Sequence, residues 1–137
     1  MAAARRKVGR DHHEGAVATY IPTLATADPN WFAVCAAGVD GTVQTAGDVD
    51  VAFSIQSISK AFVYALVCEG FGHEAVRDRV GVNNTGFPFN SVIAIELNDG
   101  HPMNPMVNAG ALATTAMMPG RTPAEQWEQI RAGLSAF

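Results

Sequence analysis

The sequence predicts a mixed α/β (α+β) fold in which an antiparallel strand hairpin is followed by several helices. Three observations support this prediction. An apolar, strand-like run at 31–37 precedes the turn signal Asp40-Gly41. An almost uncharged run occupies 55–69, and a segment with strong helix-start signals begins at Thr122. The first pattern is typical of paired strands, and the other two are typical of helices.

Residues 31–46 are predicted to form the hairpin. The first strand, WFAVCAA at 31–37, is rich in residues that favour strands, and the return strand covers 42–46. The Asp-Gly dipeptide between them favours a tight turn because glycine adopts positive φ freely. Upstream, HHEGAVATY at 12–20 is expected to form a short helix that stops before Pro22. Two strands alone make a marginal sheet, so we expect this sheet to be incomplete.

A buried helix is predicted to begin at Ile55 or Ser57, to run to Glu69 and to be closed by Gly70. Apolar side chains would lie on nearly every side of this helix, and Lys60 is its only charge before Glu69. A short amphipathic helix is predicted at HEAVRDRV (73–80), and a buried helix of small residues at NPMVNAGALATTAMM (104–118). The Asn-, Gly- and Pro-rich stretch between these two is expected to be a loop.

The last predicted helix has a complete start signal. Thr122 is a good N-cap, Pro123 suits the first helical position, and Glu125 completes a capping box. Apolar residues then recur at helical spacing as far as Phe137, without a stop signal. We therefore expect the sequence to be cut there. The whole of 1–137 is expected to be the N-terminal portion of one domain, with 1–11 as a disordered tail.

Charge and hydropathy exclude several classes of function. The net charge of −4 gives nucleic-acid binding no electrostatic support. The chain contains neither an apolar run long enough to span a bilayer nor the apolar segment of a secretion signal. Charged residues make up only 16 % of the chain, against roughly 25 % in an average soluble protein. We therefore expect an oligomer or a part of something larger.

The two cysteines and four histidines show no spacing typical of a metal site. Cys35 and Cys68 each lie in an apolar run, so we expect buried free thiols in a reducing cytoplasm. No metal and no organic cofactor is predicted.

Ser57 and Lys60 form the spacing Ser-x-x-Lys inside the predicted helix. Residues three apart share a helix face, so the Lys60 amine is expected beside the Ser57 hydroxyl. A serine hydroxyl becomes a good nucleophile when a base removes its proton, and lysine is such a base where apolar surroundings favour its neutral form. Backbone N–H groups at a helix start also favour a developing oxyanion. The spacing alone leaves two interpretations open: a catalytic pair, or a chance pair whose lysine reaches water.

Five segments occur in a fixed order along the chain: YIPTLA (20–25), GDVDVAFSIQSISKAF (47–62), RVG (79–81), GFPFNS (86–91) and PMNPMVNAGAL (102–112). The combination of FSIQSISK with NPMVNAGA is specific. Together these segments resemble the serine-dependent glutaminases.

The resemblance implies hydrolysis of the side-chain amide of L-glutamine to L-glutamate and ammonia. By this resemblance, Ser57 is the nucleophile and Lys60 its general base or proton shuttle. Asn108 corresponds to an asparagine that binds substrate, and Tyr20 to a tyrosine that lines the site. Gln56 flanks the nucleophile and is expected to contribute to substrate binding. Neutral amide and hydroxyl groups suit the charged ends of glutamine, which they bind through directed hydrogen bonds. On spacing alone, Tyr20 is equally well a packing aromatic.

The resemblance covers most of 15–117 and implies a fold similar to serine β-lactamases and DD-peptidases. That fold has an antiparallel sheet flanked by helices, together with a helical subdomain. The family's domain is considerably longer, and roughly half of its site lies in the later part. We therefore expect a fragment with little activity of its own. The resemblance also implies a homo-oligomer, a dimer or tetramer, for the full-length protein. A cytoplasmic location is expected from the free thiols.

Two alternatives remain open from the sequence. The first is another serine hydrolase of the β-lactamase or penicillin-binding-protein type. The absence of a secretion signal argues against it, because its substrates lie outside the cytoplasm. The second is a non-catalytic remnant, or one half of an assembly that packs on a complementary chain. The missing strands favour this second alternative.

Overall fold

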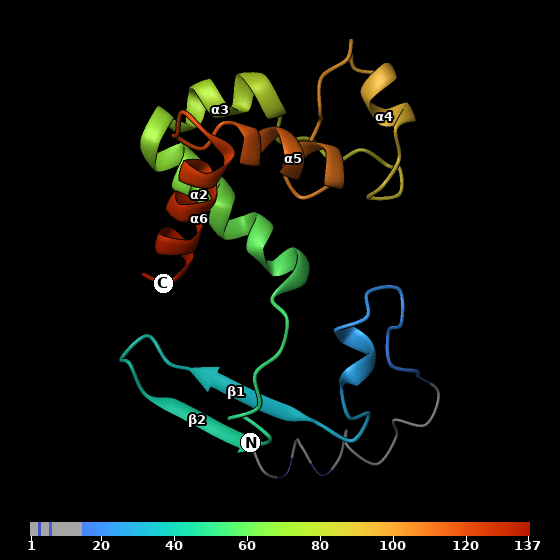
Figure 1. Ribbon diagram of the computed structural model, residues 1–137, viewed down its shortest axis with the longest axis vertical. Coiled ribbons are helices and arrows are strands. Elements are labelled where there is room, and N and C mark those ends of the chain that lie inside the picture. Colours follow the sequence, from blue (N-terminus) through green and yellow to red (C-terminus); the bar gives the residue numbers. More distant parts are fainter. Residues whose placement is uncertain (1–2, 4–5, 7–14) are drawn as a thin grey trace. The chain divides into compact units, whose positions relative to one another are not determined.

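The structure is a computed structural model that describes residues 15–137 together with Ala3 and Arg6. It divides into two compact units, Met1–Ser54 and Ile55–Phe137, and each is described by itself (Figure 1). The predicted mixed fold class is confirmed, since the described residues form a two-stranded antiparallel sheet and several helices. That the whole chain belongs to one domain stays a prediction. Among the described helices, none is both long enough and apolar enough to span a bilayer.

The two predictions for the N-terminal segment have different outcomes. The disordered tail at 1–11 lies almost wholly outside the described residues. The helix predicted at 12–20 is wrong where the structure describes it, because residues 15–20 contain no helix. Gly15 at one end and Pro22 just beyond the other leave a run too short to hold a helix without tertiary support.

Two strands form the hairpin of the first unit, β1 (Ala33–Ala37) and β2 (Val43–Gly47). They pair antiparallel, with the first residue of β1 opposite the last residue of β2. A short 3-10 helix, η1 (Leu24–Thr26), precedes them. The predicted hairpin is confirmed. No described residue of this unit is buried, so the two strands have no core of their own.

The turn of the hairpin lies where the Asp-Gly dipeptide predicts it. The Gly41 N–H donates to the Gly38 carbonyl at 3.0 Å, and the Gly38 N–H donates to the Thr42 carbonyl at 2.7 Å. Gly41 has a φ of 82°, which closes a three-residue hairpin loop and is accessible to glycine at little cost. The Asp40 carboxylate accepts from both the hydroxyl and the N–H of Thr42. These two bonds lower the pKa of Asp40.

The second unit is helical. Its elements, in chain order, are η2 (Gln56–Ile58), α2 (Ser59–Phe71), α3 (His73–Val80), α4 (Ile93–Glu96), α5 (Asn108–Ala116) and α6 (Pro123–Leu134). Helix α2 contacts α3, α5 and α6 (Figure 1). The core between these helices is aliphatic and comprises Val63, Val67, Val76, Val80, Met118 and Ile130.

Helix α2 differs from the prediction in two respects, its end and its burial. It is closed by Gly72 rather than Gly70, because Gly72 has the positive φ of 82° that stops a helix and its N–H donates to the Cys68 carbonyl. The helix is also less buried than predicted. Only Val63 and Val67 are buried in it, so its other apolar faces are half-buried or exposed.

Helix α5 is shorter than the predicted 104–118. It begins at Asn108, because Asn104 precedes Pro105 and a residue before proline disfavours helical geometry. Gly110 and Thr114 are the buried residues of this helix. A Cβ on Gly110 would overlap the Asn104 carbonyl, so glycine is what permits the close approach of helix and preceding loop.

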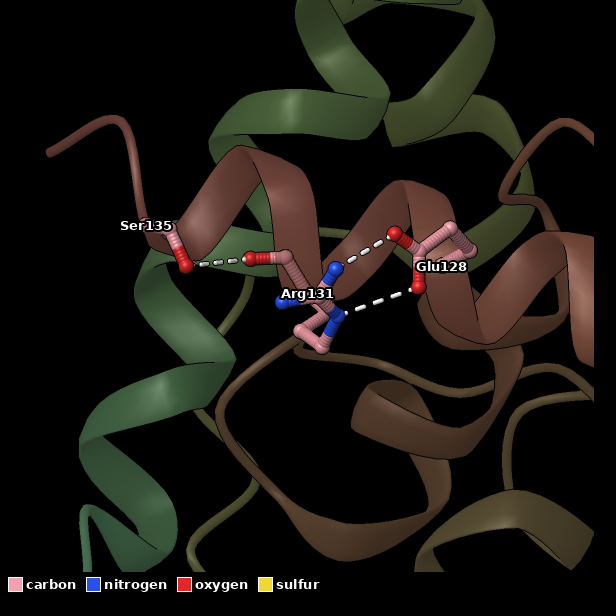
Figure 2. Close-up of polar contacts among 3 residues, drawn as sticks. All are labelled: Glu128, Arg131 and Ser135. Carbon is pink, nitrogen blue, oxygen red and sulfur yellow. Dashed lines mark hydrogen bonds and ion pairs between the residues drawn. The ribbon is translucent and has the colours of Figure 1, made fainter.

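Helix α6 begins as predicted. The Thr122 hydroxyl accepts the Glu125 N–H at 3.2 Å, and the Glu125 carboxylate reaches back to the Arg121 N–H at 2.6 Å. On its exposed face, Arg131 forms a bidentate pair with Glu128, and the Ser135 hydroxyl donates to the Arg131 carbonyl (Figure 2). The hydrogen bond and the charge of Arg131 lower the pKa of Glu128.

Candidate active site

Ser57 and Lys60 line one cavity in the second unit. Ser57 lies in η2, and Lys60 lies in the first turn of α2. The cavity has a volume of about 370 Å³ and is also lined by Phe89 and Met106. Ser57 is exposed and Lys60 is half-buried. The two residues of the Ser-x-x-Lys spacing therefore share a space that is open to a small molecule.

The Lys60 side-chain nitrogen is held by two oxygen acceptors. Its Nζ donates to Asn108 Oδ1 at 2.7 Å and to the Met106 carbonyl at 3.1 Å. It also lies 5.9 Å from the centroid of the Phe89 ring, within the range of a cation–π contact. Among the described residues, no hydrogen bond joins Lys60 to Ser57. The lysine thus lines the same cavity as the serine, and its two described acceptors come from residues 106 and 108.

Asn108 reaches Lys60 because it is the first residue of α5. Its N–H donates to the Phe89 carbonyl at 2.8 Å, which ties the start of this helix to the loop before α4. Lys60 and Asn108 line a second cavity, of about 290 Å³, between α2 and α5. Lys60 therefore borders two cavities, one that contains Ser57 and one that contains Asn108.

A loop before α5 supplies the second acceptor. The Met106 N–H donates to Asn104 Oδ1 at 2.7 Å, and Asn104 Nδ2 donates to the Asn83 carbonyl at 3.0 Å. Sequence reasoning assigned no site role to Asn104, Met106 or Phe89. The Asn-Pro dipeptide at 104–105 is a turn signal, but which lysine the turn would face depends on tertiary structure.

Gln56 stands directly before the serine with an unusual backbone. Its φ is +46°, in the left-handed region that a non-glycine residue seldom adopts. Such geometry costs of order 1 kcal/mol and is found often at functional sites. Tyr20 belongs to the first unit, where it lies in a bend before η1 and is 76 % exposed. The roles of Gln56 and Tyr20 remain predictions.

The apolar setting expected around the lysine is only partly present. Ile55 and Ile58, which flank the serine, are 43 % and 55 % exposed. The reason is that the core lies further along α2, around Val67. The cysteines are free, but Cys35 is exposed and Cys68 is half-buried, so the expected burial of both thiols is wrong. Within the described part of the chain, no three histidine, cysteine or acidic side chains gather as a metal site would require.

Comparison with known proteins identifies the family. A family model described as Glutaminase matches residues 15–137. Glutaminase 2 of Yersinia pestis is 47 % identical over 123 residues, which are 90 % of this chain and 36 % of that protein. A glutaminase of Brucella abortus is 46 % identical over 91 % of this chain and 39 % of its own length. The chain thus spans about two fifths of the length of these relatives.

A solved structure shows the same fold. The probable glutaminase YbaS superposes with a TM-score of 0.90 and 41 % identity, over 96 % of this chain and 42 % of that one. The match extends over nearly all of the described residues, and the family model covers far more than half of the sequence. The predicted resemblance is confirmed, and the chain belongs to the glutaminase family.

Proposed function

We propose that this chain carries the nucleophile-bearing part of a glutaminase, an amidohydrolase that converts L-glutamine to L-glutamate and ammonia. One observation carries the proposal. Ser57 and Lys60 open onto the same cavity, and the Lys60 amine is held there by Asn108 and the Met106 carbonyl. Membership of the glutaminase family supplies the substrate class.

In the proposed reaction, Ser57 Oγ attacks the side-chain amide carbon of glutamine, and neutral Lys60 takes the hydroxyl proton. The tetrahedral intermediate then breaks its C–N bond, and the proton passes to the leaving nitrogen as ammonia departs. Water hydrolyses the resulting glutamyl ester by the same route and restores Ser57. The two oxygens at Lys60 suit this cycle because they stabilise the ammonium that forms each time the lysine accepts a proton.

Asn108 is proposed to bind substrate with the other half of its amide group. Its oxygen is directed to Lys60, so its NH₂ group is left to donate hydrogen bonds. A carboxylate or carbonyl oxygen of glutamine is the matching acceptor. Gln56, next to the nucleophile, and Tyr20 are proposed as further residues that line the glutamine site.

The location and assembly of the protein are also proposals. Two free thiols suit the reducing cytoplasm. Large apolar side chains such as Trp127 and Phe137 are 62 % and 72 % exposed, and a homo-oligomer is one way to cover such surface. No nucleic-acid, membrane, metal or cofactor partner is proposed.

Ammonia release from L-glutamine tests the function. It is measured for this chain and for a version extended by any downstream sequence in the same reading frame. We expect turnover in the extended version and little in residues 1–137, which span about two fifths of the relatives compared. Ser57→Ala is expected to lower kcat by at least about a thousandfold with little change in the free energy of unfolding. A Ser57→Ala protein that stays active would overturn the assignment.

The same proteins separate the alternatives. A chromogenic β-lactam replaces glutamine in a parallel assay. Hydrolysis of the β-lactam without release of ammonia from glutamine would favour an enzyme of the β-lactamase or penicillin-binding-protein type. Absence of both activities in a folded, extended protein would favour a non-catalytic remnant or an assembly half.

A further inference from the structure

We propose that Asn104 is a positioning residue for Lys60, a role that rests on the proposed function of the Ser57–Lys60 pair. None of the hydrogen bonds described for Lys60 goes to Asn104. It acts on the Met106 carbonyl, which is one of the two acceptors that hold the Lys60 amine.

The first step is the turn that the Asn104 side chain makes. Its Oδ1 accepts the Met106 N–H at 2.7 Å, across Pro105. An asparagine oxygen bonded to the N–H two residues later forms an Asx turn, which fixes the direction of the intervening peptide groups. The Met106 carbonyl emerges from this turn and accepts from Lys60 Nζ at 3.1 Å.

The second step is the anchoring of the turn. Asn104 Nδ2 donates to the Asn83 carbonyl at 3.0 Å, and the Asn83 N–H donates to the Met103 carbonyl at 2.8 Å. On the opposite side, the Asn104 backbone packs against α5 at Gly110, where no Cβ fits. The turn is therefore held between the segment after α3 and the first turn of α5.

Asparagine is the side chain that this place requires. It offers an acceptor to Met106 and a donor to Asn83 in one short planar group. Aspartate keeps the acceptor and loses the donor, whereas alanine loses both. Comparison of Asn104→Asp with Asn104→Ala therefore distinguishes the effect of the hydrogen bond to Met106 from that of the hydrogen bond to Asn83.

The reactivity of the Lys60 amine reports the contact directly. The sequence has only two lysines, Lys7 and Lys60, so Lys7 serves as an internal reference. In competitive acetylation with acetic anhydride, read by mass spectrometry, the Lys60 rate is divided by the Lys7 rate. An amine whose N–H groups are held by two acceptors reacts more slowly, because its nitrogen turns less freely towards the reagent.

We expect Asn104→Ala to raise this ratio several-fold and Asn104→Asp to leave it closer to wild type. The matched control is Asn98→Ala, which removes a similar bond, from Asn98 Nδ2 to the His101 carbonyl at 2.9 Å. It should leave the ratio within about twofold, since the described hydrogen bonds of Asn98 go to Ile95 and His101 and not to the Met106 turn. An unchanged ratio in folded Asn104→Ala, or an equal rise in Asn98→Ala, would overturn the proposal. Should Asn104→Ala fail to fold, folded Asn104→Asp decides. A Lys60/Lys7 acetylation ratio well above that of the wild type in this variant would count against the proposal, and a ratio close to wild type would support it.

Kinetics of an active, extended protein complete the test. Misplacement of a catalytic group by about 1 Å costs up to a hundredfold in rate. Asn104→Ala is expected to lower kcat between about tenfold and a hundredfold with KM within about twofold, and Asn104→Asp to recover part of kcat. A rise in KM with unchanged kcat contradicts positioning. If no form releases ammonia, the proposed function fails, but the acetylation ratio still decides whether Asn104 sets the Lys60 contact.

Discussion

The hairpin unit and the helical unit differ in what holds their side chains. In the helical unit, Val67, Val76 and Val80 are fully buried between helices. In the hairpin unit, no described residue is buried, and local hydrogen bonds hold the turn. The side chains of the helical unit are thus held by tertiary packing, whereas the hairpin unit is held by hydrogen bonds between nearby residues.

The proposed site residues follow this division. Lys60, Val63 and Val67 occupy one stripe of α2, at spacings of three and four residues. The lysine therefore lies on the same face of α2 as the core valines, and its amine is held by Asn108 and the Met106 carbonyl. Tyr20 lies in the other unit with its side chain largely exposed, and no core of that unit fixes it.

A pair of glycines gives the largest expected effect on stability. Gly110→Ala would place a Cβ against the Asn104 carbonyl, whereas Gly70→Ala meets no atom within 4 Å. Both positions are helical. We expect Gly110→Ala to lower the free energy of unfolding by about 3 kcal/mol. Gly70→Ala should raise it by up to about 1 kcal/mol. Urea denaturation measures both, and equal effects would show that the loop does not press on α5.

A pair of valines tests whether only the helical unit has a core. Val67 is fully buried, whereas Val43 in β2 is 62 % exposed. Val67→Ala is expected to lower the free energy of unfolding by about 2 kcal/mol, because it leaves a cavity among the helices. Val43→Ala should change it by about 0.5 kcal/mol or less. A Val43→Ala cost as large as that of Val67→Ala would mean that the hairpin packs on a core.

Acid titration gives the smallest effect, with one carboxylate in each unit. Two hydrogen bonds from Thr42 lower the pKa of Asp40 from its ordinary value of 3.8. The bond from the hydroxyl has the larger effect, and the bond from the N–H has the next largest. Arg131 lowers the pKa of Glu128 from 4.5. Folding lowers the pKa of both carboxyl groups. Each ionised group therefore stabilises the folded state at any pH above its unfolded-state pKa. This stabilisation is lost as the pH falls through the folded-state pKa. Side-chain NMR titration should show both values lowered.

Two substitutions and added salt separate the causes. Thr42→Val removes the hydroxyl and should raise the pKa of Asp40, and Arg131→Gln should raise that of Glu128. High salt should weaken the effect at Glu128 more, since only there does a neighbouring charge contribute. If Thr42→Val left the Asp40 titration unchanged, the turn would not be held as described.

Local signals allowed the hairpin and α6 to be predicted. The Asp-Gly dipeptide and the Thr122 capping signal act within a few residues, so their outcome depends little on the rest of the chain. The end of α2 could not be placed as well. Gly70 and Gly72 give similar stop signals, and the choice of Gly72 accompanies the start of α3 directly after it.

The site was predictable only in part for the same reason. The Ser-x-x-Lys spacing is local and marked Ser57 and Lys60. The contacts of Lys60 with Met106 and Asn108 join residues 46 and 48 positions apart, which no periodicity shows. Asn108 was indicated by family resemblance alone. The proposed role of Asn104 was not predicted, because Asn104 bonds Met106 and it is the Met106 backbone carbonyl that contacts Lys60.

The central claim is that Ser57 becomes covalently glutamylated with Lys60 as its base. The extended protein is mixed with L-glutamine, quenched in acid within the first turnovers, digested, and analysed by mass spectrometry. We predict one glutamyl ester on the peptide that carries Ser57, absent in Ser57→Ala and strongly reduced in Lys60→Met. Ammonia release with no such ester, an ester on another residue, or undiminished glutamylation in Lys60→Met would contradict the claim.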